Sequence, residues 1–423
     1  MIMNLIEFGS ISHIQKGKKP LKQVNTPTDG YLPYVDIETF ETGNIKAYAN
    51  GEKCLPCKKG DILIVCDGSR SGFVGKAIDG YVGSTLAIIS ADGMLPEYLY
   101  YFLQGKYALL NTKKKGTGTP HLDTNILNQQ KLVVPSEDEQ KRIVAKIEEL
   151  FSELDNGVET LKKTKQQLAV YRQAVLKEAF EGRLTVQYRL NRQVQAVQKD
   201  FNSIKKLNPI YKDVSGDENE IKLNIPESWI KIRFGDVFDV EVGSTPSRRV
   251  DEYWNGDIPW VSSGEVHFTP IFSTEECITQ EGLNNASTNV HPTGTIMLAM
   301  IGEGKTRGQA AILNIPAAHN QNTAAILVSK TPCQPKYIYY FLQMNYENTR
   351  RVGSGNNQKA LNKERVRALR FPFASFEEQK LIVEEIENRL SVCDSIEQTV
   401  NTALQQAEAM RQSILKKAFE GEL

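Results

Sequence analysis

The chain has 423 residues, of which 40% are hydrophobic and 24% are charged, a composition typical of globular proteins. This length exceeds what one compact core usually holds and predicts two or three domains, since a domain has roughly 100 to 200 residues. The formal net charge is zero, so bulk charge excludes neither nucleic acid nor protein as a partner.

Targeting and redox signals point to the cytoplasm. No apolar run approaches the ~20 residues that a membrane span needs, and the N-terminus lacks the basic and apolar blocks of a signal peptide. The six cysteines are irregularly spaced and predict no disulfide framework. We therefore expect a cytoplasmic protein with no membrane association.

The first globule is predicted at residues 1–135. Runs of apolar and β-branched residues at 61–66 and 85–90, bounded by polar residues and glycine, predict strands. Residues 96–110 predict a helix that carries a Tyr-Tyr-Phe-Leu face into a core. We expect an α/β globule built on irregular, mostly antiparallel sheet.

A helical segment follows at residues 136–184 and shows a heptad pattern. Apolar residues recur on alternating steps of three and four, which is typical of a coiled coil. The positions are Val144, Ile147, Phe151, Leu154, Val158, Leu161, Leu168, Val175 and Ala179. Lys165 and Arg172 interrupt the pattern.

The second half begins after a polar segment at residues 185–225, which we predict to be a linker because it is rich in Gln, Lys, Asn and Asp. A second globule is predicted at 226–372, with strands at 295–301 and 324–329 and a helix at 335–346. A second helical segment occupies 373–423. Its heptad positions are Val383, Ile386, Leu390, Cys393, Val400, Leu404, Ala407, Ile414 and Ala418, with Glu397 and Arg411 as exceptions.

The two halves are copies of one another. Residues 172–184 return as 411–423 with nine of thirteen positions identical, at an offset of 239 residues. The offset is 226 near the start of each globule, where Gly17 matches Gly243. The globules differ far more than the helices do, which is typical of a common spacer that carries two different readers.

The two heptad segments are expected to pack on each other. Neither is followed by another apolar stripe, so an antiparallel two-helix coiled coil is the simplest way to bury both. A run of ~40 helical residues would span roughly 60 Å. The alternative is that each helix folds back on its own globule.

Several motifs resemble the specificity subunit of type I restriction-modification enzymes. Residues 243–261, preceded by Pro226 and Trp229, resemble the opening of a target recognition domain of that family. Residues 116–135 resemble the end of such a domain, and 416–423 resemble the end of the family's spacer helix. The N-terminal globule departs from the pattern because it lacks the Pro-x-x-Trp lead-in.

The resemblance implies an α+β protein with two recognition domains and no catalytic site or cofactor of its own. Each domain would read one half of an interrupted, asymmetric target in double-stranded DNA, and the helices would fix the gap. Two modification subunits, which carry the adenine methyltransferase chemistry, would dock on the chain. A restriction subunit with translocase and nuclease activity joins in some assemblies of the family.

Polar loops supply the candidate DNA contacts. Base edges and phosphates are bound by Arg, Lys, Asn, Gln, Ser and Thr side chains, although solvated charge is the alternative for each loop. His121 lies in a Gly-rich loop expected to face DNA, with a hydrogen bond inside the loop as the alternative. The other candidates are Ser69, Arg70, Ser71, Lys113, Lys114, Lys115, Thr117, Arg248, Arg249, Lys305, Thr306, Arg307, Arg350, Arg351, Asn356, Asn357, Gln358 and Lys359.

Other signals are weaker. Residues 299–306, which include Lys305, fit a relaxed phosphate-loop pattern. The residues after them predict a strand, however, where such a loop needs a helix. Cys54 and Cys57 form a lone Cys-x-x-Cys pair, and the five histidines are scattered without ligand spacing, so no metal site is expected. No methyltransferase, hydrolase or nuclease motif is found.

Three alternatives to the main interpretation remain at this point. The first is a specificity subunit of a methylation-only or type IIB-like system. The second is a coiled-coil scaffold whose globules bind proteins, and the third is a nucleotide hydrolase that uses Lys305.

Overall fold

The computed structural model describes residues 5–116, 120–190, 195–207, 223–302, 304–351 and 361–423. The chain divides into two compact units. Unit 1 contains residues 1–164 and 399–423, and unit 2 contains residues 165–398. Each unit therefore combines one globule with parts of both long helices.

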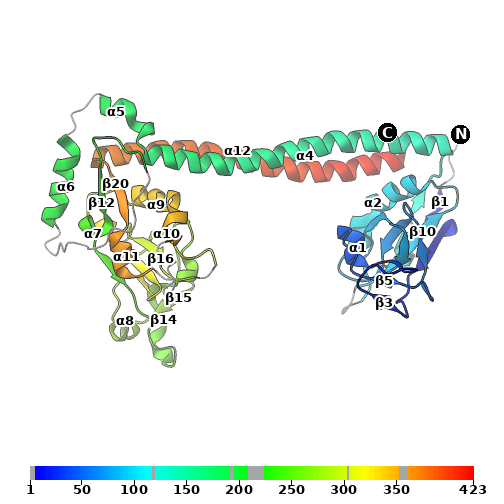
Figure 1. The fold of residues 1–423 in the computed structure, drawn as a ribbon, viewed down its shortest axis with the longest axis horizontal. Helices are drawn as coiled ribbons and strands as arrows, with labels where there is room; N and C mark the ends of the chain where they lie inside the picture. The colour runs from blue at the N-terminus through cyan, green and yellow to red at the C-terminus, as the bar shows by residue number, and fades with distance from the viewer. Residues whose placement is uncertain (1–4, 117–119, 191–194, 208–222, 303, 352–360) are drawn as a thin grey trace. The chain divides into compact units, whose positions relative to one another are not determined.

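The described residues of unit 1 form three sheets (Figure 1). The central sheet has the order β2 (Ser12–Lys16), β10 (Leu86–Ala91), β7 (Ile62–Val65) and β8 (Val74–Lys76). A second sheet has the order β3 (Gln23–Val24), β5 (Tyr48–Ala49), β4 (Leu32–Val35), β9 (Gly80–Val82) and β6 (Pro56–Cys57). The third pairs β1 (Ile6–Glu7) with β11 (Lys131–Leu132).

Unit 2 repeats this plan. Its central sheet has the order β13 (Val240–Val242), β19 (Thr323–Ile326), β16 (Ile296–Ala299) and β17 (Ala310–Ile312). A second sheet has the order β15 (Glu276–Ile278), β14 (Trp254–Val261) and β18 (Ala318–His319), and a third pairs β12 (Ile230–Arg233) with β20 (Arg370–Phe373). The paired strands are antiparallel except for β4 with β9 and β14 with β18. The predicted α+β class and mostly antiparallel sheets are confirmed.

Short helices complete the globules. In unit 1 they are α1 (Ile37–Thr42), α2 (Pro96–Thr112) and α3 (Thr124–Asn128). In unit 2 they are α7 (Phe234–Val237), α8 (Gln280–Asn285), α9 (Pro335–Met344), α10 (Tyr346–Arg351) and α11 (Lys363–Ala368). The predicted core helices thus correspond to α2 and α9.

The repeated glycines Gly17 and Gly243 have the same physical role. A Cβ added at Gly17 would lie 2.2 Å from the carbonyl oxygen of Gly83, just beyond β9. A Cβ added at Gly243 would lie 1.9 Å from the carbonyl oxygen of His319, at the end of β18. Only glycine allows the chain leaving β2 or β13 to pass this close to the neighbouring strand. The shared offset seen in the sequence therefore marks a shared backbone crossing.

Two long helices extend beyond the globules: α4 (Glu137–Phe180) and α12 (Phe376–Glu420). In unit 1 the first part of α4 packs on the last part of α12, and Arg411 stacks 4.7 Å from the centroid of the Phe151 ring. In unit 2 the last part of α4 packs on the first part of α12, where Arg172 bonds Asp394 at 2.6 Å. Partner numbers fall as numbers along α4 rise, so the helices are antiparallel in both units, as predicted (Figure 1).

The interruptions of the heptad are charged contacts between the helices. Arg172 donates to Glu397 at 2.9 Å, and Lys165 lies 3.8 Å from the same carboxylate. Arg411 pairs with Asp155. The predicted apolar positions are buried or half-buried along both helices. Complementary charges at polar positions of a coiled coil favour one register, so these residues specify how the helices align.

The C-terminal end of each long helix closes the core of the other half's globule. Phe419, near the end of α12, packs in unit 1 with ring centroids 5.0 Å from Tyr98 and 5.4 Å from Phe102. Phe180, the equivalent residue at the end of α4, packs in unit 2 at 5.0 Å from Tyr337 and 5.5 Å from Phe341. The repeated sequence at the helix ends is therefore a core contact.

The predicted linker is partly helical. It contains α5 (Val186–Leu190) and α6 (Gln195–Leu207), and α6 buries Val197 and Ile204 in the core of unit 2. The predicted solvated stretch at 215–220 lies outside the described residues. The part of the predicted linker at 195–207 therefore packs on the second globule.

A buried polar junction forms where the linker enters the second globule. Glu378, at the start of α12, accepts hydrogen bonds from Thr185 Oγ1 at 2.8 Å and from the indole nitrogen of Trp229 at 2.8 Å. Arg189 donates to the same carboxylate at 2.5 Å. The Pro-x-x-Trp lead-in therefore has a structural role in unit 2, because its tryptophan satisfies a buried charge.

None of the helices in the described parts of the chain has both the length and the apolar composition that crossing a membrane requires.

Candidate DNA interface

The hairpin loop between β7 and β8 lies against the end of α2 in unit 1. Asn111 Nδ2 donates to the carbonyl oxygens of Ser69 at 2.9 Å and Ser71 at 3.0 Å. Lys114 Nζ donates to the Ser69 carbonyl at 2.9 Å. The structure thus brings together two candidate loops, 69–71 and 113–115, which are more than 40 residues apart in sequence.

Ser71 holds this loop in place and is not available to DNA. Its side chain is fully buried, and its hydroxyl donates to the carbonyl oxygen of Gly68 at 2.7 Å and lies 3.2 Å from those of Cys66 and Pro120. A buried hydroxyl with these partners stabilises the turn. We therefore withdraw Ser71 as a candidate contact.

Carboxylates orient the remaining basic candidates of unit 1. Arg70 bonds Glu41 at 2.8 Å and stacks 4.1 Å from the centroid of the Phe73 ring. Lys115 bonds Asp123 at 2.9 Å. Lys113 is exposed just after α2 ends. Thr117 lies outside the described residues.

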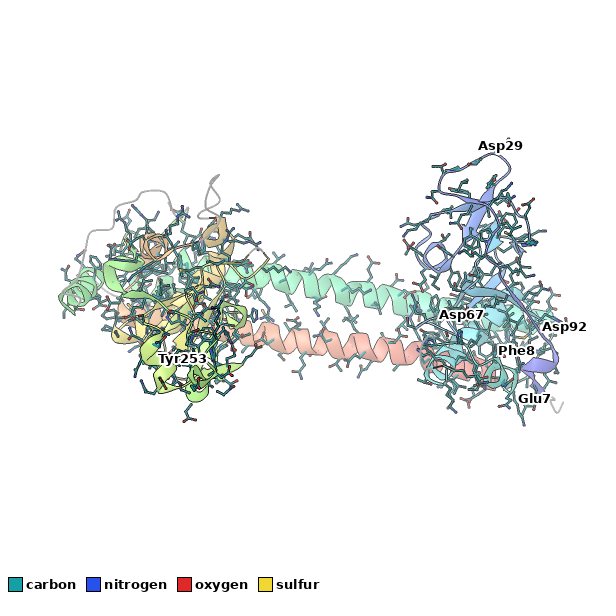
Figure 2. All side chains as sticks on the ribbon, turned by 90° about the horizontal axis from the view of Figure 1, so that it is seen from below. Glu7, Phe8, Asp29, Asp67, Asp92 and Tyr253 are labelled. Carbon is teal, nitrogen blue, oxygen red and sulfur yellow. The ribbon has the colours of Figure 1, made fainter. Side chains whose placement is uncertain are left out.

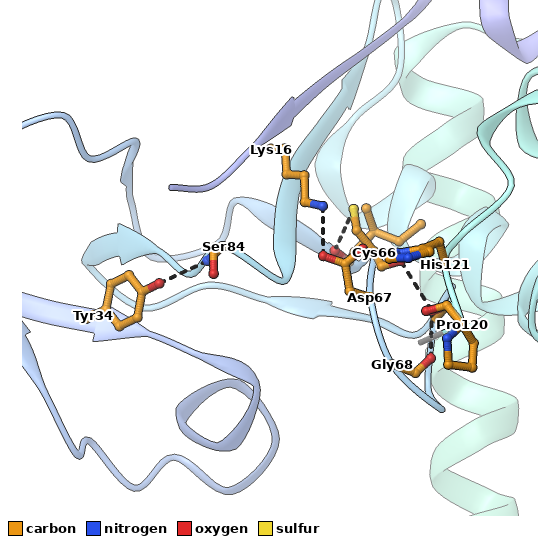
Figure 3. A network of polar contacts seen from close by, with 10 residues as sticks. Lys16, Tyr34, Cys66, Asp67, Gly68, Ser84, Pro120 and His121 are labelled. Atoms are coloured by element: carbon orange, nitrogen blue, oxygen red, sulfur yellow. Dashed lines mark hydrogen bonds and ion pairs between the residues drawn. The ribbon is translucent and has the colours of Figure 1, made fainter. Parts of the chain in front are cut away.

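His121 belongs to a polar trio that the sequence did not reveal (Figure 3). Its Nδ1 bonds one oxygen of Asp67 at 2.7 Å, and Lys16 Nζ lies 2.7 Å from the other. Although burial opposes ionisation, the bonds from Lys16 and His121 lower the pKa of Asp67 below its ordinary value. The only sequence feature that could have indicated Lys16 as a functional residue is its position next to the repeated Gly17.

Unit 2 has the equivalent arrangement around the loop between β16 and β17. Tyr346 donates its hydroxyl to the carbonyl oxygen of Lys305 at 2.5 Å and accepts from Arg350 at 3.0 Å. Gly308 crosses close to Arg350, because a Cβ there would lie 3.3 Å from the Arg350 backbone nitrogen. The candidate loop 305–307 is therefore brought to the candidate Arg350.

The other candidates of unit 2 differ in their exposure to solvent. Arg351 is exposed at the end of α10. Thr306 is half-buried, and so is Arg307, which follows it. The candidates that lie outside the described residues are Asn356, Asn357, Gln358 and Lys359.

Arg248 lies in a separate pocket. Its guanidinium stacks 3.7 Å from the centroid of the Trp254 ring and forms a two-pronged ion pair with Glu276. These residues line a cavity of about 520 Å³. Arg249 is exposed beside it. The pairing holds Arg248 rigidly, and a DNA phosphate or base would have to compete with Glu276 for it.

Lys305 is not followed by a helix. After Lys305 the chain makes a turn and enters strand β17. No helix N-terminus is therefore aimed at a phosphate bound next to Lys305, as the sequence predicted. Cys57 is buried, its thiol bonds the carbonyl oxygen of Ile78 at 3.4 Å, and burial raises its pKa to about 11. Such a thiol is protonated and a poor metal ligand at neutral pH.

The prediction that the histidines are scattered is wrong for His291 and His319, whose Nε2 atoms lie 3.1 Å apart in unit 2. Thr323 Oγ1 donates to the carbonyl of Asn320 at 3.0 Å and lies 2.7 Å from His319 Nδ1, which must therefore donate to it. His319 Nε2 then accepts a hydrogen bond from His291. This chain of bonds needs a neutral His319.

Acid is expected to destabilise unit 2 through His319. Burial, and to a lesser degree His291, lowers the pKa of His319 to about 3. In the unfolded chain this histidine has a pKa of about 6.5 and is protonated below that pH, whereas in the folded chain it stays neutral down to about pH 3. Because the unfolded state binds the extra proton, the free energy of unfolding falls as the pH drops below about 6.5. The loss from this group should reach about 2 kcal/mol at pH 5.

Urea unfolding followed by tryptophan fluorescence would measure this effect, because all three tryptophans, Trp229, Trp254 and Trp260, lie in unit 2. His319→Asn should flatten the difference between pH 7.5 and pH 5. The control His267→Asn, which removes an exposed histidine of unit 2, should leave the difference unchanged. An equal pH response in wild type and His319→Asn would contradict the assignment.

Comparisons with known proteins agree with this architecture. The family model for the type I restriction modification DNA specificity domain matches residues 3–169 and 226–406. The MjaVIII type I specificity subunit of Methanocaldococcus jannaschii is 24% identical, with 99% of this chain and 92% of that protein covered. The EcoBI specificity subunit of Escherichia coli is 25% identical, with 99% and 85% covered.

Solved structures share the fold. A chain from a study of the assembly and conformational transition of a type I restriction-modification system aligns with a TM-score of 0.69 at 18% identity, covering 99% of this chain and 98% of that one. The HsdS subunit of Thermoanaerobacter tengcongensis aligns with a TM-score of 0.55 at 19% identity, covering 99% and 97%. Since the family model matches both halves and most of the sequence, this chain belongs to the family of type I restriction-modification DNA specificity domains.

Proposed function

We propose that this chain is the DNA sequence-specificity subunit of a type I restriction-modification complex. Each globule reads one half of an interrupted, asymmetric target in double-stranded DNA. The observation that carries the proposal is the duplication itself: one fold plan occurs twice, with different side chains in equivalent loops. A symmetric dimer presents identical readers to both half-sites, whereas two diverged readers on one chain can recognise unlike half-sites.

The domain limits proposed for this function are the recognition domains at 1–135 and 226–372, the spacer helices at 136–184 and 373–423, and the linker between. The chain itself performs no chemistry in this proposal. Two modification subunits dock on it, and a restriction subunit can join the complex.

Exposed apolar side chains on the helix pair of unit 2 support docking of a protein partner there. Tyr171 on α4 and both Val392 and Ile396 on α12 are exposed. Tyr171 and Ile396 neighbour Arg172 and Glu397, which are paired across the two helices. Large exposed apolar side chains on a pair of helices are typical of a protein interaction surface.

The direct test is methylation mapping in cells. Sequencing that detects methylated adenines should find one interrupted motif modified when the gene is present and unmodified after its deletion. Restoring the gene on a plasmid should restore the same motif. An unchanged methylation pattern after deletion would rule the proposal out.

Salt dependence tests the phosphate contacts. Lys113 and Arg351 lie just after equivalent core helices, so Lys113→Ala and Arg351→Ala should weaken binding by a similar factor on every duplex and reduce the salt slope by about one each. Fluorescence anisotropy of the complex with its modification subunits, measured from low to moderate salt, gives this slope.

A matched control is Lys162→Ala, an exposed lysine in the middle of α4. It should leave the slope at the wild-type value. A base-specific loss in Lys113→Ala, limited to some sequences, would instead make that lysine a base-reading residue.

A further inference from the structure

The trio of Lys16, Asp67 and His121 lies at one edge of the central sheet of unit 1 (Figure 3). Strands β2 and β7 both run antiparallel to β10 and end at this edge. Lys16 is the last residue of β2, and Asp67 follows β7 by two residues. The trio is therefore built on the ends of two rigid strands, which restrains its side chains more than a free loop would.

The trio points polar groups outward. The Asp67 side chain is mostly buried, with 17% exposed, whereas those of Lys16 and His121 are 51% and 54% exposed. The Asp67 carboxylate accepts from His121 Nδ1, which leaves Nε2 for another partner. Lys16 keeps further N–H donors besides the one that faces Asp67. Asp67 thus orients two exposed hydrogen-bonding groups side by side.

The same place in unit 2 carries apolar side chains. Lys16 pairs with Ala87 of β10, and Val242 pairs in the same way with Ala324 of β19. Val65 and Ala299 are the equivalent last residues of β7 and β16.

Asp67 and Ile301 are therefore equivalent, since each follows its strand end by two residues. The Ile301 side chain is 45% exposed. A charged trio in one unit is thus matched by Val242 and Ile301 in the other.

One backbone hydrogen bond in each unit also supports the equivalence. The backbone nitrogen of Leu122 donates to the carbonyl of Cys66 at 2.8 Å, and that of Leu361 donates to the carbonyl of Met300 at 3.0 Å. His121 precedes Leu122. The residue before Leu361 is Ala360, whose structure lies outside the described residues.

We propose that this edge is a base-reading position in both units, with a different chemistry in each. This inference rests on the proposed function and deepens it. In unit 1, Lys16 and His121 bind the major-groove edge of a purine through hydrogen bonds. In unit 2, Ile301 contacts the methyl group of a thymine.

The contrast between the units argues for bases and against phosphates. Phosphates are identical along any DNA sequence, so a phosphate contact at this place would call for a hydrogen-bonding or charged group in both units. Base edges differ with sequence: a purine edge is read by hydrogen bonds, and the methyl group of thymine is read by apolar contact. Replacement of a lysine and an aspartate by valine and isoleucine fits a position that reads different bases in the two half-sites and does not fit a phosphate contact shared by both units.

Selection from a library of randomised duplexes tests the proposal, using the full chain in complex with its modification subunits. Wild type should select one interrupted motif. Lys16→Met and His121→Ala should each reduce base preference about ten-fold at one or two positions of one half-site. Ile301→Ala should reduce the preference for thymine several-fold in the other half-site, and the gap between the half-sites should stay unchanged in every variant.

The control is His13→Ala, which removes another exposed histidine of unit 1 that bonds an aspartate, Asp92, at 3.1 Å. Figure 2 shows Asp92 on a different part of unit 1 from Asp67. His13→Ala should select the wild-type motif. Thermal melting of each variant verifies the fold. Lys16→Met and His121→Ala should lower the melting temperature slightly, because each removes one of the two bonds to Asp67, whereas Ile301→Ala should leave it near the wild-type value.

Two results would overturn the inference: selected motifs that stay unchanged in all three variants, or an affinity loss that is equal for every sequence. Failure of the proposed function looks different, because the wild-type complex itself would then select no motif.

Discussion

Replacing Glu378 by alanine is expected to lower the stability of unit 2 by about 3 to 5 kcal/mol, the usual cost of removing one partner from a buried ion pair. Only 3% of the Glu378 side chain is exposed. Its loss leaves the Arg189 guanidinium, the Trp229 indole N–H and the Thr185 hydroxyl without their acceptor. Arg189 would keep its bonds to Thr185 and to the carbonyl oxygen of Gly182, but its positive charge would lose its counter-charge. The indole N–H of Trp229 would stay desolvated without an acceptor.

The repeat supplies the matched control. Glu139 is the equivalent residue at the start of α4, but 38% of its side chain is exposed and it pairs with its helix neighbour Arg142. Such surface pairs contribute little to stability, so Glu139→Ala should stay close to wild type. Glu139 lies in unit 1, whereas all three tryptophans lie in unit 2. Urea unfolding therefore compares the two variants when it is monitored both by far-ultraviolet circular dichroism, which reports on the whole chain, and by tryptophan fluorescence, which reports on unit 2.

A second variant separates charge from hydrogen bonding. Glu378→Gln keeps one acceptor oxygen, enough for either Trp229 or Thr185, but removes the negative charge that faces Arg189, so an intermediate loss is expected. If Glu378→Ala and Glu139→Ala unfold at the same urea concentration, the junction does not stabilise unit 2 as described.

Much of the fold could be predicted because the duplication and the heptads are properties of sequence periodicity. An apolar residue every three or four positions on a long helix can be buried only against a partner, and the predicted positions are indeed buried or half-buried. The interrupting residues Lys165, Arg172 and Arg411 were visible as exceptions. Their partners were not, since pairing across two helices depends on the register.

The sequence could not predict that each long helix ends in the core of the other half's globule. Phe180 and Phe419 are plainly equivalent, but nothing local tells which core each one enters. Apolar burial is non-directional, so sequence pattern predicts that a phenylalanine is buried without telling against which element.

The candidate interface was predicted in part, for reasons that differ by residue. Lys114 and Arg350 followed from their equal positions after the repeated helix. Ser71 looked like a loop contact because a serine between polar neighbours gives no sign that its hydroxyl is buried against three carbonyl oxygens. Lys16 and Asp67 were missed because a charged residue at a strand end resembles any solvated charge until its partner, far away in sequence, is known.

Removing one heptad from each long helix is expected to shorten the gap in the DNA target while leaving both half-sites unchanged. The deletions are residues 157–163 of α4 and 404–410 of α12. These segments lie opposite each other because Asp155 pairs with Arg411 directly beside them. Seven residues make almost two full turns, so the remaining apolar positions stay on the shared face.

The size of the effect follows from helix geometry. Seven residues at 1.5 Å each shorten a helix by about 10.5 Å, which corresponds to about three base pairs at ~3.4 Å per pair. Methylation mapping in cells that carry the variant should therefore find the same two half-sites separated by about three fewer base pairs.

Deleting the heptad from one helix alone provides the control. It puts Arg411 out of register with Asp155 and unpairs the apolar positions beyond the deletion, so it should abolish methylation at every motif. If the double deletion instead kept the original gap, the helices would not act as the spacer. If it changed the bases of a half-site, the helical segments would take part in reading them. A shorter gap with unchanged half-sites is the result that a rigid antiparallel pair requires.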